Sequence, residues 1–422
     1  MKRTRAALAC SAVLLALVAV RAESGPDTAL PGAGTLLWHV ETLAGESVDS
    51  DDADQPFNPA SIVKVATSLW ALERLGPDHR FETRFEARGE VDATDGTLRG
   101  DLIVRGSGDP DFHMENAWLV AEALNRLEVR RVAGKLVVNG RFWIDWEGGS
   151  AGREPDPARR AAGMAARLRA ALDPARWDAR LQRGWKAYAR RSGRPADRPP
   201  RIELMGGVAY EKKAGPGAPL VVHRSERLAE ALRRLNSYSN NDIERIGETL
   251  GSPEAMGEFL EARWEAPPGA VTFATTSGLG RNRMTARQVV RLLRDLRTTA
   301  DSLGVGVGSL LPVAGCGPGT LEDSFPELSV AGRAGAIVAK TGTLTRTDGG
   351  VAVLAGFVRT RGEELIFCVA APRSGNGLER ARKAQEGWVL ELLAGHGGPR
   401  PRHCGGPVPF PEEGARVVTG EP

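Results

Sequence analysis

Ser61 and Lys64 place a hydroxyl and an amine three residues apart in the mostly apolar stretch NPASIVKVATSLW, residues 58–70. Residues three apart lie on one face of a helix, so the Lys64 amine can reach the Ser61 hydroxyl. Burial disfavours the ammonium form and lowers the pKa of a lysine, which makes Lys64 a candidate general base near neutral pH. The pair therefore indicates nucleophilic catalysis, with Ser61 as nucleophile and Lys64 as base.

The element that must hold this pair is a helix. Asn58 is a favoured N-cap residue, and Pro59 suits the first helical position. Apolar residues then cover nearly the whole circumference from residue 62 to 75, which is typical of a central, buried helix. Gly76 and Pro77 end it.

The same spacing also fits a surface lysine beside a capping serine, and spacing alone favours that interpretation. The composition favours the catalytic one. Only 8 of the 56 basic residues are lysines, so a lysine at this point is an exception in an arginine-rich chain. Arginine could not serve as the base, because it does not lose its proton in proteins.

Two further tripeptides complete a pattern. Ser239-Asn240-Asn241 lies at a predicted loop-to-helix junction, and Lys340-Thr341-Gly342 lies on a predicted core strand, where Gly342 lets a substrate backbone approach closely. In this order the three motifs match the Ser-x-x-Lys, Ser-x-Asn and Lys-Thr-Gly set of β-lactamases and penicillin-binding proteins.

The chain resembles the low-molecular-mass class C penicillin-binding proteins, which are D-alanyl-D-alanine carboxypeptidases and endopeptidases of the bacterial cell wall. Beyond the motifs, the likeness lies in four segments: residues 57–83, GDLIVRGSGDPDF, SGLGRNRMTARQVVRLL and LPVAGCGPGTL. It implies an α/β fold with a penicillin-binding-protein or β-lactamase-like transpeptidase domain, in which helices flank an antiparallel sheet. A second domain is then inserted between the Ser-x-x-Lys and Ser-x-Asn motifs.

The resemblance also implies the reaction. Ser61 would attack the penultimate D-Ala of a peptidoglycan stem peptide while Lys64 takes its proton, and water would later hydrolyse the acyl-enzyme. The backbone N–H groups of Ser61 and Thr343 would form the oxyanion hole. Ser239 would relay a proton to the departing D-Ala, and Asn241 would hold the peptide amide and Lys64. β-Lactams would act as inhibitors.

The C-terminal carboxylate of the substrate would bind at the Lys-Thr-Gly motif. The resemblance implies that Lys340 and the hydroxyls of Thr341 and Thr343 receive the terminal carboxylate, with Gly342 beside the substrate backbone. No cofactor is implied, and the six histidines show no metal-ligand spacing, so the sequence predicts no metal site.

Three positions depart from the family pattern. Asn240 stands where the family has Asp, and we expect its side chain to face away from the substrate. Thr275 and Thr276 replace an Asp-Gly pair before Ser277 and Gly278. Asn139 replaces an Asp thought to hold the ammonium group of the third stem residue, so we expect a weaker preference for a free amine there.

Two other hypotheses stay open at this point. Tyr238-Ser239-Asn240 also satisfies the Tyr-x-Asn motif of class C β-lactamases and related esterases, in which the tyrosine relays the proton. The second hypothesis is a peptidoglycan-binding protein that has the same fold but is catalytically silent. The long insert after Ser61 speaks against the first, and the intact Ser61, Lys64 and Lys340 speak against the second.

The first residues predict export. Residues 1–22 combine a basic start, a short apolar run and the small-residue site Val20-Arg21-Ala22, which is typical of a cleaved signal peptide and predicts a periplasmic protein. Removal of residues 1–22 changes the net charge from +3 to −1, so overall charge does not call for nucleic acid. Cys316, Cys368 and Cys404 remain, which allows one disulfide plus a free thiol without fixing the pairing.

Changes in composition divide the chain. We expect a signal peptide at 1–22, a serine acyl-transferase domain from residues 23–80 and 225–398, an inserted domain at 81–224, and a flexible tail at 399–422. The acyl-transferase part should contain a strand pair at 35–48 and a final meander of strands at 336–344, 349–360 and 363–372, followed by a helix at 378–394. A hairpin around Asp95-Gly96 should open the insert.

Within the insert, residues 153–201 hold 14 basic and 5 acidic side chains. Apolar residues repeat every four positions, which predicts a pair of basic amphipathic helices, with Asp173 and Pro174 beginning the second. Such helices are more often a solvated face than a binding surface. The functional alternative is peripheral contact with an anionic envelope surface.

Overall fold

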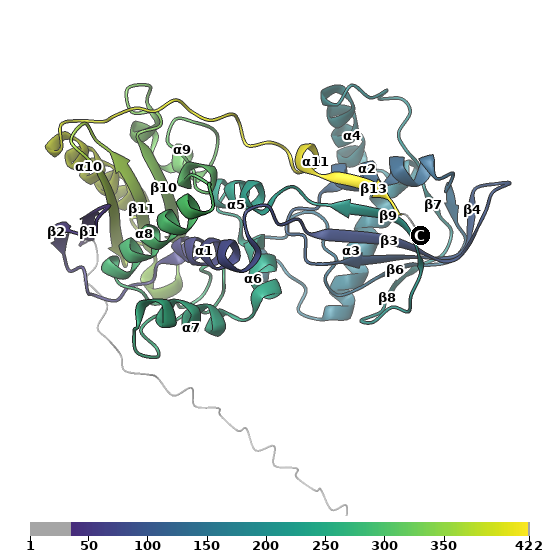
Figure 1. Cartoon of the computed structure of the whole chain (residues 1–422), viewed down its shortest axis with the longest axis horizontal. Coiled ribbons are helices and arrows are strands. Elements are labelled where there is room, and N and C mark those ends of the chain that lie inside the picture. The colour runs from purple at the N-terminus through teal and green to yellow at the C-terminus, as the bar shows by residue number, and fades with distance from the viewer. Residues whose placement is uncertain (1–34, 421–422) are drawn as a thin grey trace, which may run out of the picture.

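The computed structural model describes residues 35–420, and the predicted signal peptide lies outside them. Two sheets organise the chain and lie side by side (Figure 1). The first is an antiparallel sheet of five strands in the order β10 (Ile337–Leu344), β11 (Val351–Arg359), β12 (Glu364–Pro372), β1 (Leu37–Thr42), β2 (Ser47–Asp51). This is the predicted meander joined to the predicted strand pair.

Helices cover both faces of the first sheet. Strand β11 is apolar at every position but its last, and because side chains alternate across a strand it supplies both faces. Val353, Ala355 and Phe357 pack with α1 (Val63–Leu75) and α8 (Ala286–Ser302) on one side. Leu354 and Val358 pack with α10 (Leu378–Gly395) on the other. The remaining helices of this part are α5 (Leu228–Ser237), α6 (Glu244–Leu250), α7 (Pro253–Trp264) and α9 (Thr320–Ser324).

The insert has its own sheet and core. Its long hairpin is the predicted one, and it is extended on both sides in the order β13 (Arg416–Thr419), β9 (Ala218–Arg224), β3 (Glu82–Asp92), β4 (Thr97–Gly106), β5 (Arg131–Val132), β7 (Glu203–Leu204). Short strands β6 (Leu136–Val138) and β8 (Val208–Tyr210) pair beside β4. Helices α2 (Met114–Arg126) and α3 (Pro157–Leu172) pack on this sheet, and α4 (Ala179–Arg191) packs through an aromatic cluster around Trp118.

The predicted helix pair at 153–201 is present, but its second helix begins later than expected. Asp173 and Pro174 form only a single 3-10 turn, in which the Asp173 carboxylate accepts from the Ala175 N–H. Asp178 caps α4 instead, accepting from the Leu181 N–H at 2.8 Å. Trp177 has extended backbone between the two, so the turn and the helix are separate elements.

The predicted tail ends in two regular elements. After α10 the chain crosses from the first sheet to the insert, where α11 (Pro411–Gly414) and β13 follow (Figure 1). Strand β13 pairs antiparallel with β9, and a disulfide joins Cys404 to Cys316. The segment is thus linked to the rest of the chain at two points, one at Cys404 and one at β13. Between residues 35 and 420 no helix is long and apolar enough to cross a membrane.

Candidate active site

Ser61 lies in a tight turn that precedes helix α1. The α-helix begins at Val63, later than the capping pattern predicted, because Ala60 has a left-handed φ of 49°. Residues 60–62 form one 3-10 turn, and the Asn58 side chain accepts from the Ala60 N–H at 3.1 Å. A non-glycine residue in this conformation is strained, and such strain concentrates at functional sites. Gly76 ends the helix as predicted.

Lys64 is wholly buried and reaches Ser61. Its Nζ lies 2.8 Å from Ser61 Oγ and donates to Asn241 Oδ1 at 2.8 Å and to the Ser277 carbonyl at 2.7 Å. Burial lowers the pKa of Lys64 to about 7, an effect partly opposed by the negative charge of Glu244. A lysine with this pKa is half neutral at physiological pH, which is the form that can accept the Ser61 proton.

Lys340 supplies the second buried amine. It projects from β10 and lies 2.8 Å from both Ser239 Oγ and the Thr341 carbonyl. Burial, and then the charge of Lys64, hold the pKa of Lys340 well below its usual value. An arriving carboxylate would favour the charged form, so Lys340 is suited to bind an anionic substrate group.

A cleft of about 310 Å³ collects the predicted residues at the open edge of β10. Its lining comprises Ser61, Tyr238, Ser239, Asn241, Gly278, Leu279, Thr320, Ser324, Thr341, Thr343, Leu344 and Arg382. The three motifs thus meet around one space, although they are far apart in the chain. Lys64, Lys340 and Gly342 do not line this space. Lys64 bonds to the lining residues Ser61 and Asn241, and Lys340 bonds to Ser239.

Some contributors gave no signal in the sequence. Arg382 extends from α10 and donates to Thr343 Oγ1 at 3.1 Å, and Thr320 Oγ1 lies 2.7 Å from Thr341 Oγ1. Arg382 is one of many arginines, so only the fold identifies it. Thr320 lies in the LPVAGCGPGTL segment, but the segment by itself assigns it no contact with the Lys-Thr-Gly motif. Glu244 accepts from the Ser277 hydroxyl at 2.6 Å and fixes the segment that holds Lys64.

The departures from the family pattern have structural explanations. Asn240 does not line the cleft; its side chain accepts from the Asp242 N–H at 2.8 Å and caps the following turn. The Thr275 hydroxyl accepts from the Gly278 N–H at 3.1 Å, as a short polar side chain does in such turns. Gly278 must be glycine, because its φ is 93° and a Cβ would lie 1.9 Å from the Ala60 carbonyl.

The structure does not bring Asn139 to the cleft. Its amide donates to the Gly106 carbonyl at 3.0 Å and accepts from the Gly106 N–H at 3.1 Å, which fastens the chain after β6 to the end of β4. Asp145 pairs with His113 and Arg180, and Asp101 pairs with Arg88, so both carboxylates already have cationic partners.

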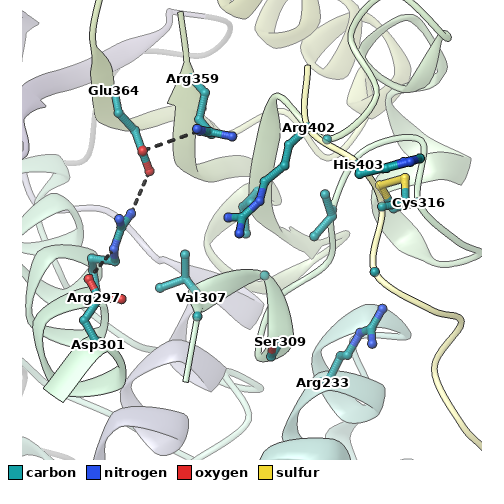
Figure 2. Close-up of a pocket in the computed structure, with 17 residues that line it drawn as sticks. Arg233, Arg297, Asp301, Val307, Ser309, Cys316, Arg359, Glu364, Arg402 and His403 are labelled. Atoms are coloured by element: carbon teal, nitrogen blue, oxygen red, sulfur yellow. Dashed lines mark hydrogen bonds and ion pairs between the residues drawn. A yellow bond between two sulfur atoms is a disulfide. The ribbon is translucent and has the colours of Figure 1, made fainter. Parts of the chain in front are cut away.

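A larger cavity, about 670 Å³, lies elsewhere and contains none of the motif residues (Figure 2). Arg233, Arg402 and His403 border it beside the disulfide, and an ion-pair chain of Arg297, Glu364 and Arg359 forms another side. Size alone therefore does not locate the chemistry in this molecule.

Comparison with known proteins decides the family. The model of the D-Ala-D-Ala carboxypeptidase 3 (S13) family matches residues 22–158 and 198–391. The chain belongs to this family. The match confirms the resemblance inferred from the motifs, and the unmatched stretch 159–197 falls within the arginine-rich block.

Curated relatives agree with the family. A D-alanyl-D-alanine carboxypeptidase of Actinomadura sp. (strain R39) is 36% identical over 127 residues, which is 29% of this chain and 22% of that protein. A carboxypeptidase of Mycobacterium tuberculosis is 25% identical over 378 residues, covering 83% of this chain and 78% of that protein.

Solved structures confirm the predicted fold class. A predatory endopeptidase of Bdellovibrio bacteriovorus superposes with a TM-score of 0.74 at 23% identity, over 92% of this chain and 100% of that one. Penicillin-binding protein 4 of Haemophilus influenzae gives a TM-score of 0.64 at 19% identity, over 86% and 97%. The chain therefore has the α/β fold of the penicillin-binding proteins, with a second sheet inserted between the first two motifs.

Proposed function

We propose that this protein is a serine-type D-Ala-D-Ala carboxypeptidase and endopeptidase acting on peptidoglycan stem peptides. The observation that carries the proposal is the wholly buried Lys64, whose amine lies 2.8 Å from Ser61 Oγ and whose pKa is about 7. A buried lysine without a catalytic task would be a cost to stability. Lys64 lies beside the Ser61 hydroxyl, which lines the cleft, so Lys64 can act as the catalytic base.

Acylation follows from these contacts. Ser61 Oγ attacks the D-Ala carbonyl carbon while its proton passes to Lys64 Nζ. The backbone N–H groups of Ser61 and Thr343 stabilise the oxyanion. The C–N bond then breaks, and Ser239 gives a proton to the departing amine and regains one from Lys64, so that Lys64 is neutral again. The Ser239 hydroxyl lies 2.8 Å from Lys340.

Deacylation returns the enzyme to its first state. Water attacks the Ser61 ester and gives up a proton to the neutral Lys64, which passes it to the departing Ser61 oxygen as the acid product is released. Thr341, Thr343 and Arg382 line the cleft, with the Lys340 amine next to them at the Thr341 carbonyl, so a substrate carboxylate there would hold the peptide by its C-terminal end. Support for a stable acyl-enzyme with penicillin comes from the Bdellovibrio endopeptidase, which has been solved in penicillin G-acylated form.

One experiment tests the proposal directly. Purified protein without residues 1–22 is incubated with stem pentapeptide, with cross-linked muropeptide and with penicillin G, and the products are analysed by mass. We expect loss of one D-Ala from the pentapeptide and a penicillin adduct on the peptide that contains Ser61. An adduct on another serine, or no reaction with either substrate, would contradict the assignment.

The Tyr-x-Asn hypothesis retains one supporting observation, since Tyr238 lines the cleft. Against it, Ser239 rather than Tyr238 bonds to Lys340, and Asn241 rather than Asn240 bonds to Lys64. A β-lactamase deacylates quickly, whereas a penicillin-binding protein stays acylated. Sustained turnover of a chromogenic cephalosporin would favour the β-lactamase, and a single acylation event the proposal above.

We also infer that the protein is exported to the periplasm, because residues 1–22 have the composition of a cleaved signal peptide. N-terminal sequencing of secreted protein should find Glu23 first. Peripheral contact of residues 153–201 with an anionic surface stays a prediction. Arg153, Arg167, Arg191 and Arg194 already pair with acidic groups of the same chain, which reduces the charge left for such contact.

A further inference from the structure

A second groove continues from the catalytic cleft. It holds about 450 Å³ and lies between the catalytic part, the insert and the tail, and we call it the tail groove. Its lining comprises His113, Glu115, Trp146, Arg234, Tyr238, Pro318, Pro407, Val408, Pro409, Phe410, Pro411 and Glu412. Tyr238 lines both spaces, and Pro318 lies two residues before the cleft residue Thr320, so the two hollows adjoin.

The tail groove adjoins a particular end of the cleft. Tyr238 is next to Ser239, which bonds to Lys340, and Thr320 bonds to Thr341. In the proposed reaction these groups serve the departing amine and its carboxylate. The groove therefore extends from the leaving-group side of the scissile bond.

The tail groove is larger than a carboxypeptidase needs on the leaving-group side of the scissile bond. Removal of a terminal D-Ala releases one small residue, which the cleft itself can contain. Hydrolysis of a cross-link releases a whole second stem peptide, which must extend beyond the cleft. Hydrolysis of a cross-link is therefore the reaction whose leaving group is large enough to occupy the tail groove.

The chemistry of the groove suits a peptide. Trp146, Phe410 and four prolines supply apolar surface, and the Phe410 ring is half exposed. Glu412 is buried, and one of its carboxylate oxygens is bound by Arg191. The other, Oε2, has no hydrogen-bond partner in the part of the chain that the structure describes.

A buried acceptor without a donor is costly, and native structures rarely leave one unfilled. Glu115 lines the same groove, and burial together with the nearby charge of Glu412 raises the pKa of Glu115. The groove wall therefore combines acidic groups, Glu115 and Glu412, and basic groups, His113 and Arg234, with apolar surface. A peptide, which carries donors, acceptors and apolar side chains, suits such a mixed wall.

The tail wall of the groove is held in place from both ends. The Cys316–Cys404 disulfide fixes it before Pro407, at the edge of the larger cavity (Figure 2), and β13 fixes it after Glu412. Between them, Arg234 donates to the Pro409 carbonyl and pairs with Glu226 and Asp111. A wall that is ordered before binding loses less entropy when a ligand arrives.

We propose that the tail groove binds the second stem peptide of a cross-linked muropeptide dimer, on the leaving side of the scissile bond. This inference rests on the proposed function and deepens it. The amide between the D-Ala carbonyl of the first stem and the side-chain amine of the second is broken. The acyl group passes to Ser61, whose proton goes by way of Lys64 and Ser239 to the departing amine, and water later hydrolyses the ester to release the first stem as an acid.

The test compares two substrates across matched variants of the full chain. Wild type, Phe410→Ala and Glu412→Gln are assayed on a stem pentapeptide and on a cross-linked dimer, and kcat/KM is measured for each. Val418→Ala is the control, because Val418 is an exposed apolar residue of the same tail but lies on β13, outside the groove. Thermal unfolding of each variant reports whether the tail remains docked.

We expect Phe410→Ala to lower kcat/KM for the dimer by about five- to ten-fold, the usual effect of losing an aromatic contact, and to leave the pentapeptide rate unchanged. Glu412→Gln should act in the same direction. Equal rates for all variants on the dimer, or equal losses on both substrates, would overturn the inference. Wild type that cleaves the pentapeptide but not the dimer would also overturn it while leaving the carboxypeptidase proposal intact. If wild type cleaves neither the pentapeptide nor the dimer, both this inference and the proposed function are wrong.

Discussion

At the scale of single residues, two buried lysines divide the work of the site. Both are wholly buried, and burial is the main reason that both pKa values lie below the ordinary range. Lys64 bonds to the nucleophile Ser61, whereas Lys340 bonds to Ser239. A low pKa lets Lys64 accept a proton, and a neighbouring substrate carboxylate would restore the charge on Lys340. In the proposed reaction the same residue type would thus serve as a base in one place and as an anion receptor in another.

Acylation of Ser61 by penicillin G should follow the protonation state of Lys64. With a pKa of about 7, the neutral base is present above neutral pH and is lost as pH falls. The second-order acylation rate should therefore fall about tenfold per pH unit well below pH 7 and level off above it. Stopped-flow measurement of adduct formation checks this. A flat profile from pH 5 to 8 would exclude Lys64 as the base.

Lys64→Arg should lose most of this reactivity, because arginine keeps its proton. We expect acylation to slow by about 10²–10⁴-fold, the usual contribution of a general base. Thermal unfolding should be recorded beside the rate, since the larger side chain must fit a buried site. A folded variant that labels like wild type would refute the assignment.

Ser239→Ala and Tyr238→Phe distinguish the two possible proton relays. Ser239 Oγ lies 2.8 Å from Lys340, so Ser239→Ala should reduce pentapeptide turnover by about 10²-fold or more. Tyr238→Phe keeps the ring that lines the cleft and should reduce turnover little. The opposite ranking would favour the Tyr-x-Asn mechanism.

At the scale of elements, the site depends on a close approach between three backbones. Strand β10 lies at the edge of its sheet, so its outer side is open to a substrate. The turn at residues 60–62 contacts β10, and Gly278 lies against the Ala60 carbonyl. Ala60 and Ser239 both have left-handed φ angles near 50°, which shows that the nucleophile turn and the relay turn are each held in a strained form by their surroundings.

Gly278→Ala should disturb this packing. The added Cβ would lie 1.9 Å from the Ala60 carbonyl at a φ of 93°, so the turn that carries Ser61 must shift. We expect a loss of about 1–3 kcal/mol in unfolding free energy and a clear fall in penicillin acylation. Gly163→Ala is the control: a Cβ there meets nothing within 4 Å, and α3 should become slightly more stable. Equal behaviour of the two variants would contradict the argument.

At the scale of the whole molecule, the insert and the tail help to build the site. Asp242, directly after the Ser-x-Asn motif, accepts from the backbone N–H groups of Glu147 and Gly148 at 2.9 Å each. The insert loop therefore positions the turn that carries Asn241. The tail then returns to add β13 to the sheet of the insert, so both ends of the described chain are tied to the body.

Cys404→Ala should test how much the tail contributes to stability. Loss of the Cys316–Cys404 disulfide, which spans 88 residues, should lower the unfolding free energy by about 2–4 kcal/mol. Denaturant unfolding measures this, and reduction of wild type should give the same loss, whereas the variant should not respond to reductant. Acylation of Ser61 should be unchanged, because neither cysteine lines the cleft.

The sequence by itself predicted a candidate catalytic set, which the fold brings together, and most of the elements. Ser61, Lys64, Ser239, Asn241, Lys340, Thr341 and Thr343 are recognisable because motif spacing within a helix or strand is a local property. The hairpin at β3 and β4 and the meander from β10 to β12 were predictable for the same reason, since periodicity and turn residues act over short distances. The capping pattern misplaced the start of α1, because contact with Gly278 and β10 outweighs local preference at Ala60.

Only the tertiary structure decided the rest. The pairing of Cys316 with Cys404, the ordering of the tail, the role of Arg382 and the existence of the tail groove all depend on residues brought together across long stretches of chain. Such contacts leave no local pattern, because each partner has an ordinary composition around it. The pKa of Lys64 belongs to the same class: the sequence shows that a lysine is present, but only the enclosing fold removes the water that would keep it charged.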